Sequence, residues 1–215
     1  SRGLSAPTLR YYAWKPGCLS LGRAQTAGEV DHERLQALGY GLVRRPSGGS
    51  AILHIDELTY SVCLRKSDAL ARGGVLPAYR RLSAALLAGL DEIGLPARNA
   101  AAAPRRAATG AVCFEQRSHY EMTVGTRKLL GSAQWRQGGG VLQHGSLPLR
   151  GDIARICAAL AYGSPEHRER ARGRVRQRAT TLAAALGREV AWEAAAAALA
   201  RGFSRALNIE LQRGE

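Results

Sequence analysis

The stretch 113–146 constrains the fold more than any other, because glycines divide a run of strand-forming residues into short segments. Alternating apolar and polar side chains predict three strands in and just beyond it, at 119–124, 127–134 and 141–149. Gly125-Thr126, between the first two, is typical of a tight turn. Successive strands joined by short turns predict a β-meander in the middle of the chain.

Reactive side chains lie along the predicted meander among these glycines. They are Cys113, Lys128, the segment Gly131-Ser132-Ala133-Gln134 and the segment Gln143-His144-Gly145-Ser146. Glycine has no Cβ, so a backbone rich in it can approach a ligand closely. The pattern predicts a small-molecule or acyl-group site with a cysteine and a lysine.

Lys128 stands out against the rest of the charge. Of 31 basic residues only Lys15, Lys66 and Lys128 are lysines. A compact ammonium fits a small pocket, points at a single oxygen and lowers the pKa of a nearby thiol, which a guanidinium does less well. The alternative is a solvated lysine at the end of a hairpin. Its position before Leu-Leu-Gly-Ser-Ala-Gln favours function.

The remaining pattern interleaves strands and helices, which predicts an α/β (α+β) domain with a mixed β-sheet and flanking helices. Strands are expected at 8–14, at 18–21 as a continuation beyond a turn, and at 40–44 as a buried strand; helices are expected at 30–38, 77–93, 152–161, 165–172, 180–186 and 192–207. We expect residues 1–150 to form the acyl-binding catalytic domain and 151–215 a helical segment packed on it. A start at Ser1 instead of methionine suggests that the natural chain begins earlier.

A glycine pair follows the strand expected at 40–44. Arg45-Pro46-Ser47-Gly48-Gly49 leads into a second short strand. Such a turn can present backbone N–H groups to an oxygen-bearing ligand, although a plain hairpin loop has the same composition. It is not a phosphate loop, because GxxxxGK[ST] is absent from the sequence.

The charge balance calls for an acidic partner. The formal net charge is +14, but the arginines are scattered, and the densest set, between Arg168 and Arg178, repeats every second residue. On a helix that spacing spreads charge around the surface, which favours a solvated segment or an acidic protein over nucleic acid. No apolar run is long enough to span a bilayer, so we expect a soluble, cytoplasmic protein with no membrane partner.

The four cysteines are far apart and indicate neither a zinc site nor a disulfide framework. Cys63, on an apolar strand, and Cys157, on an amphipathic helix, are expected to be buried small hydrophobes. Cys113 differs because it lies where a loop enters a strand.

Four motifs in order carry a resemblance to a known family. They are Arg44-Arg45-Pro46-Ser47-Gly48-Gly49-Ser50-Ala51, Glu57-Leu58-Thr59-Tyr60-Ser61, Arg127-Lys128-Leu129-Leu130-Gly131-Ser132-Ala133-Gln134 and Leu142-Gln143-His144-Gly145-Ser146. With Trp14-Lys15-Pro16 upstream they resemble the lipoate–protein ligase A family, of the biotin/lipoate protein ligase superfamily. The resemblance covers most of the chain and implies the catalytic-domain fold of that superfamily.

One loop distinguishes two branches of the family. ATP-dependent lipoate ligases carry an Arg-Asn-Asp-like stretch before the meander, whereas this chain has Ala111-Val112-Cys113-Phe114-Glu115. That segment is similar to the Ala-Cys-Phe-Glu loop of the LipM-type cysteine octanoyltransferases. By this resemblance Cys113 is the nucleophile, and an octanoyl group moves from acyl carrier protein to a lysine of a lipoyl domain or of glycine-cleavage H protein.

The resemblance also implies roles for other residues. Lys128 would hold Cys113 as a thiolate and polarise the acyl carbonyl, and Leu53, Leu129 and Ala133 are candidates for an acyl tunnel. His144 would line the pocket or be structural. The expected substrate-binding residues are Arg45, Ser47, Gly48, Gly49, Leu53, His54, Gly131, Ser132, Ala133, His144 and Gly145.

No cofactor is expected, because a thioester donor is already activated. Two alternatives stay open. An ATP-dependent lipoate–protein ligase would need ATP and Mg²⁺ and would use Lys128 to bind an acyl-adenylate. A non-catalytic acyl or nucleic-acid binding module would show no turnover and would bind RNA or DNA in a strongly salt-dependent way.

Overall fold

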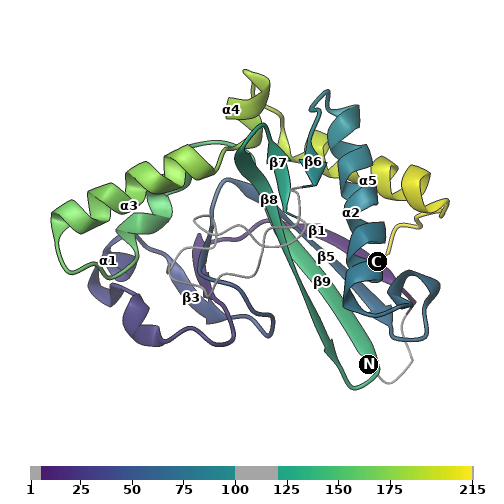
Figure 1. The fold of residues 1–215 in the computed structure, drawn as a ribbon, viewed down its shortest axis with the longest axis horizontal. Coiled ribbons are helices and arrows are strands. Elements are labelled where there is room, and N and C mark those ends of the chain that lie inside the picture. The colour runs from purple at the N-terminus through teal and green to yellow at the C-terminus, as the bar shows by residue number, and fades with distance from the viewer. Residues whose placement is uncertain (1–5, 100–120, 215) are drawn as a thin grey trace.

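A computed structural model describes residues 6–99 and 121–214, and two β-sheets organise the chain (Figure 1). The larger sheet is antiparallel, in the order β1-β5-β9-β8-β7-β6. Its strands are β1 Thr8–Tyr12, β5 Glu57–Arg65, β6 Arg98–Asn99, β7 Met122–Val124, β8 Arg127–Gln137 and β9 Gly140–Pro148. The predicted meander is confirmed as β7, β8 and β9.

Glycines make the turns of the meander. Gly125, between β7 and β8, has φ 58°, and Gly138 and Gly139, between β8 and β9, have φ 54° and 80°. Side chains with a Cβ rarely adopt this left-handed region, whereas glycine enters it freely. The register that follows pairs Lys128 with Thr123 and Ala133 with His144.

The smaller sheet is mixed, with the order β3-β2-β4. Its strands are β2 Cys18–Leu21, β3 Gly41–Arg44 and β4 Ile52–His54. β2 runs parallel to β3 and antiparallel to β4. The 3₁₀ helix η1 Ala27–Glu29 and the helix α1 His32–Ala37 connect the parallel pair. Asp31 caps the start of α1, because its side chain accepts a hydrogen bond from the Arg34 backbone N–H.

Two helices cover one face of the larger sheet. They are α2 Val75–Glu92, preceded by the 3₁₀ helix η2 Ala69–Ala71, and α5 Trp192–Leu207 (Figure 1). They approach so closely that a Cβ added at Gly202 would lie 2.5 Å from the Gly89 Cα. Leu58, Tyr60 and Val62 of β5 project into the same apolar core.

A second core lies under the smaller sheet. Leu19 and Leu21 of β2 pack there against 3₁₀ helix η4 Ile153–Ala158 and α3 Pro165–Arg178. A short helix, α4 Leu182–Leu186, then leads to α5. Mixed strand directions and flanking helices confirm the predicted fold class.

Three local expectations are wrong. β2 does not extend β1 but belongs to the other sheet. β3 is an edge strand and is largely exposed, with Leu42 and Val43 37% and 40% accessible. Cys63 is exposed because it points away from the face of β5 that carries the core residues, whereas Cys157 is buried as predicted.

Within the described ranges, 6–99 and 121–214, no helix is long and apolar enough to cross a lipid bilayer.

Candidate functional site

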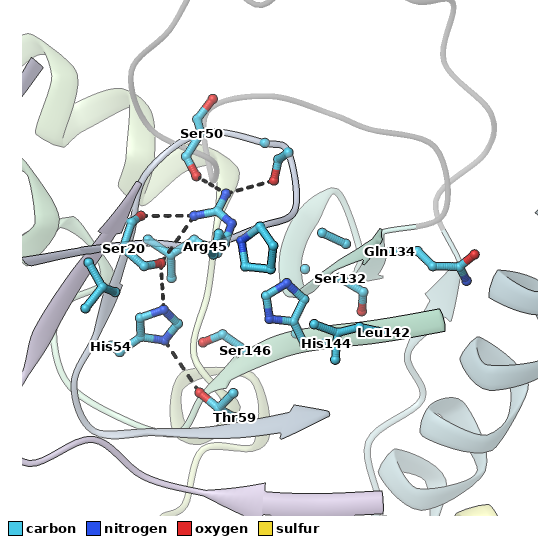
Figure 2. A pocket seen from close by; sticks show the side chains of 18 of the residues that line it. Ser20, Arg45, Ser50, His54, Thr59, Ser132, Gln134, Leu142, His144 and Ser146 are labelled. Atoms are coloured by element: carbon cyan, nitrogen blue, oxygen red, sulfur yellow. Dashed lines mark hydrogen bonds between the residues drawn. The ribbon is translucent and has the colours of Figure 1, made fainter. Parts of the chain in front are cut away.

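A pocket of about 600 Å³ lies between the two sheets, a size typical of small-molecule sites (Figure 2). Each sheet contributes one wall. The lining residues are Tyr12, Trp14, Ser20, Val43, Arg44, Arg45, Pro46, Gly48, Gly49, Ser50, Ile52, His54, Thr59, Glu121, Lys128, Gly131, Ser132, Ala133, Gln134, Leu142, His144, Gly145 and Ser146. The lining combines apolar side chains, such as Trp14, Ile52 and Leu142, with a few polar ones, so an apolar chain with one polar end is a suitable occupant.

Lys128 is a buried residue of the pocket wall and not a solvated lysine. Only 4% of Lys128 is exposed. Its Nζ donates a hydrogen bond to Glu121 Oε1 at 2.5 Å. Gly131 leaves the space for it, since a Cβ there would lie 3.0 Å from Lys128 Cε and 3.2 Å from Nζ. A buried ammonium in such a place can stabilise developing negative charge on a substrate oxygen or sulfur.

The Gly48-Gly49 loop is held by one buried arginine, Arg45. Its Nη2 donates to the Gly48 carbonyl at 3.0 Å and to the Ser50 carbonyl at 2.7 Å (Figure 2). Gly49 adopts φ 94°, and its carbonyl packs so tightly on Gly22 that a Cβ at Gly22 would come within 1.8 Å of it. The loop therefore has a defined place at the edge of the pocket.

His54, the last residue of β4, lies in a buried polar network that adjoins Arg45 through Ser20. Its Nε2 is 2.8 Å from Ser20 Oγ and its Nδ1 is 3.0 Å from Glu57 Oε1. The indole of Trp14 stacks on the imidazole, with ring centroids 4.5 Å apart, and donates from Nε1 to Thr59 Oγ1 at 3.0 Å. Packing and hydrogen bonds together fix the orientation of the histidine ring.

His144, on β9, faces the pocket and contacts the glycine loop. Its Nε2 lies 2.5 Å from Ser47 Oγ. The pKa of His144 is lowered to about 4, mainly by burial and to a smaller extent by the nearby Arg45 and His54. His144 is therefore neutral near pH 7 and serves as a hydrogen-bonding group.

The floor of the pocket is a polar cluster beneath Gly145. The Tyr60 hydroxyl donates to Ser132 Oγ at 2.6 Å and accepts from Gln143 Nε2 at 3.2 Å. Burial raises the pKa of Tyr60 to about 12, so it stays protonated. A Cβ at Gly145 would lie 2.4 Å from the Gly131 carbonyl and 2.6 Å from Tyr60 Cε1, so only glycine fits there.

The structure brings most of the predicted site residues together. Lining the one pocket are Arg45, Gly48, Gly49, His54, Lys128, Gly131, Ser132, Ala133, His144 and Gly145. Ser47 contacts the site through His144. Their binding roles remain predictions.

Two of the predicted residues, Leu53 and Leu129, are not on these walls. Leu53 alternates with Ile52 and His54 on β4 and lines a separate small depression with Ile153 and Ile156. Leu129 is buried in the core under α2 and α5. Cys113, the predicted nucleophile, lies outside the described residues.

Sequence reasoning missed Glu57 and Glu121 as members of the site. On β5 the polar Glu57, Thr59 and Ser61 alternate with core residues, which indicates a polar second face. Glu121 comes directly before β7, and no spacing in the sequence links it to Lys128.

Within 6–99 and 121–214 no group of three or more His, Cys, Asp or Glu side chains is arranged to hold a metal ion.

Known sequences resemble this chain over its whole length. The family model described as the lipoyl protein ligase A/B catalytic domain matches residues 1–204. Octanoyltransferase LipM of Symbiobacterium thermophilum is 46% identical over 220 residues, covering 100% of this chain and 80% of the relative. Octanoyltransferase LipM of Moorella thermoacetica is 43% identical over 215 residues, covering 99% and 79%.

Solved structures with the same fold are more distant in sequence. A bipartite lipoate protein ligase of Thermoplasma acidophilum, described with its E2 lipoyl domain, has a TM-score of 0.79 at 23% identity, covering 98% of this chain and 75% of that one. A lipoate-protein ligase A bound with ATP has a TM-score of 0.74 at 24% identity, covering 98% and 76%.

Proposed function

Since this chain belongs to the lipoyl protein ligase A/B catalytic domain family and is an acyltransferase, we propose the following reaction for it. An octanoyl group moves from octanoyl-loaded acyl carrier protein to a lysine of a lipoyl domain or of glycine-cleavage H protein. The observation that carries the proposal is a buried Lys128 in the wall of a partly apolar pocket. The identity to LipM octanoyltransferases supports the choice of acyl group.

Cys113 is the proposed nucleophile. Its thiolate attacks the carbonyl carbon of the donor thioester, a new thioester to Cys113 forms, and the carrier leaves as a thiolate that takes a proton from solvent. The deprotonated ε-amine of the acceptor lysine then attacks that carbonyl. An amide bond forms, the amine loses its second proton to solvent, and the Cys113 thiolate is released.

Lys128 serves both steps. In this proposal its ammonium, in the pocket wall, favours the thiolate and stabilises the oxyanion of each tetrahedral intermediate. The ion pair with Glu121 fixes its position before substrate arrives. The energy of the donor thioester suffices for both transfers, so we propose that neither ATP nor a metal is required.

The charge of the surface fits the proposed partners. A formal net charge of +14 attracts acidic proteins, and acyl carrier proteins and lipoyl domains are generally acidic. Such complementarity raises the rate of encounter more than the final affinity. The archaeal ligase described with its E2 lipoyl domain supports a lipoyl domain as the acceptor.

The test is a transfer assay with purified octanoyl-loaded acyl carrier protein and unmodified lipoyl domain, with ATP omitted. We expect the lipoyl domain to gain one octanoyl group on lysine, and we expect Lys128→Ala to lose on the order of 10²-fold in rate. Lys66→Ala is the matched control, because Lys66 is exposed on the surface. Modification only with free lipoate and ATP would identify a lipoate–protein ligase instead.

A further inference from the structure

Four buried side chains form a continuous chain of hydrogen bonds in the pocket wall. Glu57 Oε1 is 3.0 Å from His54 Nδ1, His54 Nε2 is 2.8 Å from Ser20 Oγ, and Ser20 Oγ is 3.2 Å from Arg45 Nη1. The residues are between 2% and 8% exposed. The chain thus joins a buried carboxylate on β5 to a buried guanidinium beside the glycine loop.

The chemistry of the groups is consistent with one direction of donation along the chain. Arginine can only donate, so Arg45 Nη1 donates to Ser20 Oγ, and the Ser20 hydroxyl is free to donate to His54 Nε2. We assign the His54 proton to Nδ1, because a Glu57 carboxylate 3.0 Å away can only accept. Donors point the same way along the whole chain, so each bond polarises the next.

Serine, histidine and a carboxylate occur in this order in hydrolase triads. Here the serine is held in place by a cation. Arg45 Nη1 donates both to Ser20 Oγ and to the Ser20 carbonyl, at 3.0 Å, and only 2% of Ser20 is exposed. The arrangement favours a role in holding Arg45 over a role as nucleophile.

Arg45 in turn determines where the pocket-lining loop lies. Its other nitrogen binds the carbonyls of Gly48 and Ser50, and Figure 2 shows both bonds beside the pocket. A guanidinium that loses the Ser20 hydroxyl keeps these two bonds and the bond from Nη1 to the Ser20 carbonyl, but it loses the contact that links it to His54. The side of Arg45 that faces His54 therefore contributes to the position of the loop.

We propose that Glu57 and His54 are positioning residues, which orient Ser20 and through it Arg45, and so fix the 48–50 loop for binding of the acyl donor. The predicted effect on donor binding rests on the proposed function, whereas the chain of hydrogen bonds itself does not. Removing a link should weaken donor binding and leave the chemical steps nearly unchanged, because Ser20 and His54 lie on the smaller sheet, whereas Lys128 lies on β8 of the larger one.

The first test is ¹⁵N NMR of the histidine rings without substrate, with the His54 signals assigned by their loss in His54→Gln. We expect His54 to donate from Nδ1 and to accept at Nε2, and we expect its Nε2 resonance to shift in Ser20→Ala. A proton on Nε2 in the wild-type protein, or an unchanged resonance in Ser20→Ala, would overturn the proposal.

The second test compares steady-state kinetics of Ser20→Ala, Glu57→Gln and Glu57→Ala. We expect Ser20→Ala and Glu57→Ala to raise KM for the octanoyl donor about tenfold, the effect of losing one buried hydrogen bond, with kcat within about threefold. Glu57→Gln keeps a carbonyl oxygen opposite Nδ1 and should restore part of the loss. Asp56→Asn is the matched control, since Asp56 pairs with Arg155 away from the pocket.

Several results would contradict the positioning role. They are a fall in kcat at unchanged KM, an equal change in Asp56→Asn, and an octanoyl group found on Ser20 in the Cys113→Ala variant. Circular dichroism confirms that each variant is folded, and Ser20→Ala keeps the test available if the Glu57 variants unfold. If the wild-type protein transfers no octanoyl group, the proposed function fails. The NMR result then still shows whether the chain of hydrogen bonds through His54 exists.

Discussion

Lys128 Nζ lies 2.5 Å from Glu121 Oε1, and both side chains are buried in the wall of the same pocket. The ion pair links the start of β8 to the residue just before β7. It presents a cation of fixed position to the pocket, which a flexible surface lysine cannot do.

We predict that Lys128→Arg loses most of the transferase activity although the charge is kept. Lys128 packs directly against the Gly131 backbone, where even a Cβ would lie 3.0 Å from Lys128 Cε, so the larger, planar guanidinium does not fit in the same place. The rate of octanoyl transfer measures this, with thermal unfolding as the check on the fold. An unchanged rate would show that only the charge matters.

Gly131→Ala tests the same geometry without touching the lysine. The added methyl displaces the lysine side chain, so we expect kcat to fall by about tenfold or more. Gly140→Ala is the control on the same hairpin, because a Cβ there has its nearest neighbour, the Gln137 carbonyl, at 3.4 Å. Equal activities of the two variants would mean that the position of Lys128 is not critical.

The lowered pKa of His144 predicts a loss of stability in mild acid. In the unfolded chain its pKa returns to 6.5, whereas in the folded protein it is about 4. Between these values the unfolded state binds more protons, so the free energy of unfolding falls as the pH falls through this window, by at most about 3 kcal/mol.

His144→Gln should remove most of this pH dependence. Urea unfolding at about pH 7.5 and about pH 5 measures it. Arg155 and Arg176 lower the pKa values of their partners Asp56 and Asp152 from 3.8. These two carboxyl groups therefore change the free energy of unfolding mainly below the pH range in which His144 acts. The same slope in both proteins would show that His144 does not cause it.

The crossing of α2 and α5 predicts a contrast between two glycines. Gly202→Ala places a Cβ 2.2 Å from the Gly89 nitrogen, so we expect a loss of about 3 kcal/mol in the free energy of unfolding. Gly173→Ala, in α3, meets nothing within 4 Å and should stabilise by about 0.5–1 kcal/mol. Chemical denaturation compares them, and similar values would contradict the close helix contact.

The sequence predicted the meander and pointed to Lys128, which the structure shows in the pocket wall and whose catalytic role stays a prediction. Alternation and turn glycines determine strands locally, and a lysine in an arginine-rich chain points to a requirement that arginine does not meet. The family motifs brought distant segments into one site, which periodicity alone could not do.

Other features depend on contacts between distant segments. Glu121 reaches Lys128 across a register irregularity between Met122 and Thr123, which no local pattern reveals. Cys63 was misjudged because the run Val62-Cys63-Leu64 is apolar on both faces, although only the outer two side chains are buried. Leu53 belongs to the face of β4 turned from the pocket.

The central claim is that Cys113 carries the acyl group. Its most direct test is the intact mass of the protein after mixing with octanoyl-loaded acyl carrier protein without ATP, followed by peptide mapping. We predict one octanoyl group on Cys113, its absence in Cys113→Ala with a loss of activity on the order of 10³-fold or more, and no loss in Cys63→Ala, the exposed control cysteine. An unmodified protein that forms lipoyl-adenylate once lipoate and ATP are added would contradict the account.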